Sequence, residues 1–137
     1  MFQRFSRNLT PDFKARSADR DLQTDRTRAV SIMAAIEQAL AAAELEQAGL
    51  GRRVENVMAR AAVTFGNGTD EYLEREALDS HHHDLFDDEL TNGQRRLRQL
   101  EHTIAHYKVL KAEAFSRFSG ELAAAESDTQ TALAGMR

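Results

Sequence analysis

The chain has 137 residues, with 18 Lys and Arg against 22 Asp and Glu and a formal net charge of -4, and this is the length of one domain. It has no Cys, which excludes disulfide scaffolds, thiol catalysis and cysteine-based zinc sites and fits a reducing, cytoplasmic compartment. No apolar run approaches the ~20 residues of a membrane-spanning helix. The chain also lacks a large basic stripe, which argues against nucleic-acid binding.

Residues 1–18 are predicted to form an amphipathic N-terminal segment. Large apolar residues recur there at spacings of three and four, with basic residues between them, and this pattern is typical of a segment that lies in a membrane interface. The residues predicted to bind the membrane are Phe2, Arg4, Phe5, Arg7, Leu9 and Phe13. Two alternatives stay open: the stripe packs against the rest of the chain, or it is a disordered tail.

A heptad pattern predicts one long helix over residues 19–65. Twelve positions separated alternately by four and three residues include ten apolar ones, and a period of 3.5 is typical of one face of a left-handed coiled coil. We call these residues the first seam: Leu22, Arg26, Ala29, Met33, Ile36, Leu40, Ala43, Gln47, Leu50, Val54, Val57 and Ala61. The pattern keeps its register through Gly49 and Gly51, so we expect the helix to continue there, although each Gly costs roughly 1 kcal/mol.

A turn is predicted at residues 66–68, where two Gly flank an Asn, because these residues accept positive φ angles. A second seam follows, and we expect one helix there with a local defect near residue 92. Its residues are Phe86, Leu90, Gly93, Leu97, Leu100, Ile104, Tyr107, Lys111, Ala114 and Phe118. The predicted fold class is therefore all-α, a long antiparallel two-helix coiled-coil hairpin over residues 19–122. Residues 123–137, rich in Ala, Ser and Thr, are expected to fray.

Apolar residues beside the two seams predict self-association. A lone pair of helices would leave them in water, and such flanking positions are typical of a bundle with further helices. They are Val30, Met58, Phe65, Val109, Leu110 and Phe115. We therefore expect a homo-oligomer, a helical bundle built from several copies. The alternative is that these are scattered surface residues, which are common in proteins.

The sequence offers little for catalysis. It has no Gly-rich phosphate loop, no thiol and no His beside a nucleophile with an orienting acid, so we predict no enzyme, no catalytic residue and no cofactor. Residues 81–83 are three adjacent His, which point about 100° apart on a helix and so cannot all bind one ion. His102 and His106 have the i, i+4 spacing of metal pairs, but the heptad places them on the outer face. A metal-binding bundle is therefore a hypothesis, and a solvated polar face is the prediction.

Two stretches resemble a known family. Residues 59–78 begin with an Ala-rich helical stretch, continue through Gly and acidic residues, and end in the letters LEREAL at 73–78. This stretch resembles the hairpin tip of the phage-shock protein A family, which is related to ESCRT-III-type membrane-remodelling proteins. The letters FQRF at 2–5 are similar to that family's N-terminal amphipathic segment. The resemblance implies that the apolar side chains of residues 1–18 insert into a membrane, with Arg4 and Arg7 meeting phosphates. It also implies that the hairpin binds a regulator or itself.

Two functions of different classes follow. The first is a non-enzymatic coiled-coil protein that binds the anionic surface of the inner membrane from the cytoplasm and acts in envelope stress or membrane maintenance. The alternative is a soluble helical-hairpin adaptor or secretion chaperone, because a long antiparallel hairpin also suits docking onto a helical protein partner.

Overall fold

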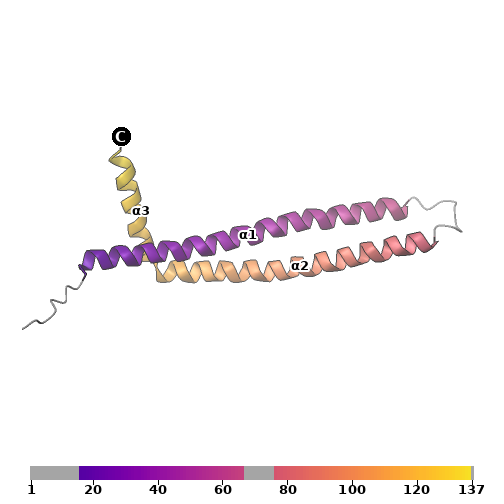
Figure 1. Cartoon of the computed structure of the whole chain (residues 1–137), viewed down its shortest axis with the longest axis horizontal. Coiled ribbons are helices and arrows are strands. Elements are labelled where there is room, and N and C mark those ends of the chain that lie inside the picture. The colour runs from indigo at the N-terminus through magenta and orange to yellow at the C-terminus, as the bar shows by residue number, and fades with distance from the viewer. Residues whose placement is uncertain (1–15, 67–75, 137) are drawn as a thin grey trace, which may run out of the picture.

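The computed structural model describes residues 16–66 and 76–136, and it describes their side chains except at residues 64–66 and 76–82. In this part of the chain the protein is all-helical. Helix α1 spans Ala18–Gly66, α2 spans Glu76–Arg117 and α3 spans Ser119–Ala134. Helices α1 and α2 lie side by side and run in opposite directions, while α3 leaves the end of α2 and turns across the start of α1 (Figure 1). At 1.5 Å per residue, α1 alone is about 70 Å long.

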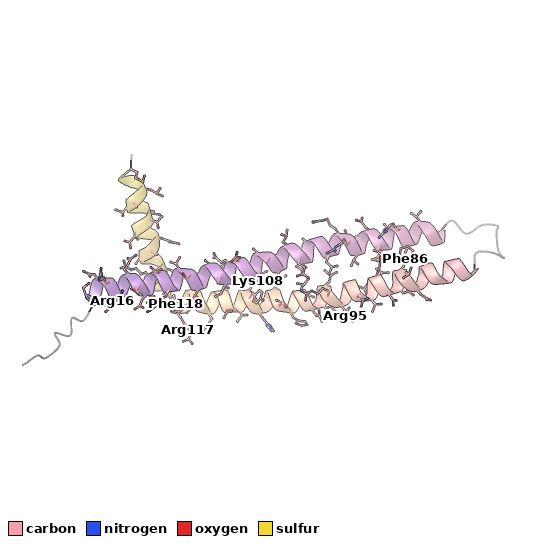
Figure 2. The ribbon with its side chains drawn as sticks, in the orientation of Figure 1. Arg16, Phe86, Arg95, Lys108, Arg117 and Phe118 are labelled. Atoms are coloured by element: carbon pink, nitrogen blue, oxygen red, sulfur yellow. The ribbon has the colours of Figure 1, made fainter. Side chains whose placement is uncertain are left out.

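The two predicted seams face each other. With one exception in the first seam, every residue of both seams is buried or half-buried. The centre is a cluster of Leu40, Ala43, Leu100 and Ile104, and Figure 2 shows Phe86 on the side of α2 that faces α1. The interior of the pair is apolar, because the described residues contain no buried polar or charged side chain.

The exception is Leu22, the first residue of the first seam, whose side chain is 54% exposed. Helix α2 ends at Arg117, about one heptad before it would lie opposite Leu22. The heptad pattern identifies an apolar face, but a residue on that face is buried only where a second helix reaches it. The prediction that Leu22 packs in the seam is therefore wrong.

Both helices continue through the glycines that the sequence analysis singled out. Helix α1 passes Gly49 and Gly51, and α2 passes Gly93, without a break. Gly93 lies where the two helices approach closely: a Cβ atom placed on it would stand 2.6 Å from Cγ2 of Val54. The missing side chain at this seam position thus permits close contact rather than marking a joint.

The boundary near residue 66 is described only in part. Helix α1 ends at Gly66, the first residue of the predicted turn, and the rest of that turn lies outside the described residues. The open end is where α1 begins and α2 ends, and the tip end is where α1 ends and α2 begins.

Residues 119–134 form α3, where the sequence analysis expected a frayed tail from residue 123. The helix forms because Ala has the highest helix propensity. Its Ser and Thr hydroxyls, which compete with the backbone elsewhere, donate here to the carbonyl four residues earlier within the helix. An ion pair of 3.0 Å between Arg26 Nη1 and Asp128 Oδ2 ties it to α1. Arg26, a polar residue of the first seam, thus pairs with a carboxylate of α3.

Candidate functional site

The open end carries the candidate functional surface. The residues predicted to bind a membrane lie within 1–15, outside the described residues, and the described chain resumes at the exposed Arg16 just before α1. The open end, where α1 begins (Figure 1), is therefore the part of the described structure that follows this segment in the sequence. What the described residues add is the surface at this end.

The residues predicted to self-associate are exposed in the single chain. The side chains of Val30, Met58, Val109, Leu110 and Phe115 are all at least 42% exposed, and the side chain of Phe65 lies outside the described residues. Met58 lies toward the tip end, while the other four lie near the open end. They therefore do not form one continuous patch along the rod.

One side of the open end is formed by Ile32 and Leu110. The ion pair between Arg96 Nε and Glu46 Oε1, 2.8 Å long, fixes which residues of the two helices are level on this side. Ile32 lies two heptads from Glu46 on α1, and Leu110 lies two heptads from Arg96 on α2, both toward the open end. Their side chains are 43% and 50% exposed. Ile32 was not predicted from the sequence, because its position becomes informative only when the antiparallel register is known.

The other side of the open end is a groove partly covered by α3. The ion pairs of Lys108 with Glu44 and of Lys111 with Glu37 mark this side. Beyond them lies an open groove of about 490 Å³. Its lining residues are Val30, Met33, Glu37, Phe115, Leu122, Ala125, Glu126, Thr129 and Gln130. Helix α3 thus supplies one wall, and Phe115 remains 59% exposed beside it.

A second groove, of about 600 Å³, lies on the Glu46 side near Gly93. Its floor is apolar and its rim carries Arg53, Arg60 and Arg96 together with Glu46 and Glu89. Arg96 makes a bidentate contact with Glu46, since its Nη2 also donates a hydrogen bond to Glu46 Oε2 at 3.1 Å. The hydrogen bond from Arg96 lowers the pKa of the Glu46 carboxyl, and the same bond raises the pKa of Arg96.

We expect the Glu46 pKa to rise when Arg96 is replaced by Gln, because the charge-assisted hydrogen bond that favours the carboxylate is then lost. A side-chain carboxyl titration by NMR measures this. The depressed pKa in the folded chain makes the pair stabilising above the unfolded pKa, and this contribution is lost as the pH falls through the folded pKa. An unchanged Glu46 titration in Arg96→Gln would show that the contact does not form in solution.

Metal-ligating side chains are not gathered into one centre within the described residues. His102 and His106 are exposed on α2, and no group of three or more His, Asp or Glu side chains within the described residues is placed to hold a metal ion. The side chains of His81 and His82 lie outside the described residues. None of the described helices combines the length and the apolar character needed to cross a bilayer.

Comparison with known proteins does not assign the chain to a family: no family model, curated protein or solved structure matches it.

Proposed function

We propose that this protein is a non-enzymatic helical rod that binds an anionic membrane surface in the cytoplasm through its N-terminal segment and open end, and that it self-associates as a coiled coil. Its role would be in envelope stress or membrane maintenance. The observation that carries the proposal is the gathering of exposed apolar side chains at the end of the rod where α1 begins, next in the sequence to residues 1–15. The resemblance of residues 59–78 and 2–5 to the phage-shock protein A family favours the same function.

The open end combines apolar and basic groups. Val30, Ile32, Leu110 and Phe115 are exposed there on both sides of the helix pair, and residues 1–28 carry seven Lys or Arg against four Asp or Glu. Apolar side chains flanked by cations suit the boundary between acyl chains and anionic headgroups. Ordered apolar groups left in water are unfavourable, so a surface that covers them stabilises the bound state.

The tip end has the opposite character. Residues 67–92 carry nine Asp or Glu against one Arg, and the described acids among them, Asp84, Asp87, Asp88 and Glu89, are exposed. An anionic membrane repels such a segment. The charge distribution therefore favours contact through the open end.

The experiment is flotation with vesicles that contain anionic and zwitterionic phospholipids. We expect the wild-type protein to float with anionic vesicles and the double variant Phe2→Asp/Phe5→Asp to float at least tenfold less, because burying each Phe contributes roughly 1.5–3 kcal/mol and about 1.4 kcal/mol is tenfold in affinity. The matched control is Leu45→Asp, which places a charge on an exposed Leu of α1 away from the open end.

Equal flotation of the wild type and the double Phe variant would remove the proposed anchor. A wild-type protein that does not float but recovers one stoichiometric helical partner would favour the adaptor or secretion-chaperone alternative.

A further inference from the structure

The outer face of α2 carries an exposed stripe whose charge changes sign once along the helix, from acidic toward the tip end to basic toward the open end. Asp84, Asp88, Thr91, Arg95 and Arg98 each lie two residues before a seam residue of α2. Two residues turn an α-helix by about 200°, so this outer stripe points away from α1. All five residues are exposed, and Figure 2 shows Arg95 on the side of α2 away from α1.

The charges of the outer stripe are not neutralised within the described chain. None of the ion pairs formed by the described residues includes a charged residue of the outer stripe, that is, Asp84, Asp88, Arg95 or Arg98. Asp88 and Arg95 are seven residues apart, about 10 Å along the helix axis, which is beyond the reach of the i, i+4 pairs that stabilise helices. Asp84 and Asp88 are instead a like-charged i, i+4 pair, which is unfavourable unless something neutralises it.

The order of charges makes the outer stripe complementary to itself. When a second copy of the helix runs in the opposite direction and the two copies cross at Thr91, Asp88 of one copy lies level with Arg95 of the other, and Asp84 lies level with Arg98. This is because the two residues of each pair lie almost equally far from residue 91 along the helix. A two-fold interface needs this property, since the same patch serves on both subunits. Thr91, which falls on the axis, is small enough to let two helices approach.

We propose that a second copy of this chain docks antiparallel on the outer stripe, with Asp84 and Asp88 of each copy paired to Arg98 and Arg95 of the other. Four ion pairs form across the two-fold axis at Thr91. From residue 91 to Arg117 is about 39 Å of helix, so the two α2 ends lie about 80 Å apart, each at an open end. The proposal rests on the self-association part of the proposed function and not on membrane binding.

The test is sedimentation equilibrium of the full chain in low salt and in 0.5 M salt. We expect a dimer in low salt that dissociates in high salt, because surface charges are screened within a few ångströms at high ionic strength. The variants Arg95→Glu/Arg98→Glu and Asp84→Arg/Asp88→Arg should each dimerise at least tenfold more weakly, since like charges then meet across the axis. An equimolar mixture of the two should form a heterodimer, and the quadruple variant should recover the homodimer.

The matched control is Arg52→Glu, the same charge change on an exposed Arg of α1, which should leave the dimer intact. Circular dichroism keeps a loss of folding separate from a loss of association. A wild-type monomer in low salt, or a mixture that fails to associate, overturns the proposal. If the charge variants dimerise normally while Leu110→Asp/Phe115→Asp does not, the second copy sits on the apolar open end instead. Flotation of the same samples reports membrane binding independently.

Discussion

Replacing Leu100 by Ala is expected to destabilise the protein by about 2–5 kcal/mol. Leu100 is the largest side chain that the described structure buries completely, at 1% exposed. It belongs to one buried cluster with Leu40 and Ala43 of α1 and Ile104 of α2. The substitution removes buried apolar contacts and leaves a cavity that a straight pair of long helices closes only partly.

Chemical denaturation followed by circular dichroism at 222 nm measures the loss. The matched control is Leu45→Ala on α1, where the Leu side chain is 73% exposed, and it should change the free energy of unfolding by less than about 0.5 kcal/mol. The whole stability of a domain is only about 5–15 kcal/mol, so the Leu100 variant should show a clearly lower midpoint. Equal midpoints for the two variants would mean that the seams do not face each other.

Replacing Gly93 by Ala is expected to destabilise the protein by up to about 2 kcal/mol, because overpacking costs about 1–3 kcal/mol and the higher helix propensity of Ala offsets about 1 kcal/mol of this. The same change elsewhere in a helix normally stabilises it. The new Cβ atom would stand 2.6 Å from Cγ2 of Val54. Val54 is β-branched and strongly prefers one rotamer in a helix, so the helices must separate locally. The loss of close packing outweighs the gain in helix propensity, which is only about 1 kcal/mol.

Gly51→Ala is the matched control, because it is the same substitution in the middle of α1, and an added Cβ there meets nothing within 4 Å. It should stabilise the protein by about 0.5–1 kcal/mol. Thermal melts of the two variants should therefore shift in opposite directions. Shifts of the same sign and size would mean that α1 and α2 do not approach closely at this level.

The heptad periodicity predicted the all-helical fold and the faces on which α1 and α2 meet, since the positions from Ala29 to Ala61 and from Phe86 to Phe118 are buried or half-buried. A helix buries its apolar face, and the spacing of apolar residues in the sequence identifies that face. The exposed apolar residues beside the seams, such as Val109 and Phe115, were predictable for the same reason. What binds over these residues could not be predicted, because exposure does not specify what covers a surface.

What the sequence determined by itself is local: helical faces, apolar positions and the distribution of charge along the chain. The tertiary structure alone decided how far α2 extends along α1, and hence that Leu22 is exposed and that α3 crosses the start of α1. It also decided that Gly93 meets Val54 and that Ile32 is level with Leu110. These facts depend on the register between two segments far apart in the sequence. Register is set by the combined packing of both faces, which no single window of residues contains.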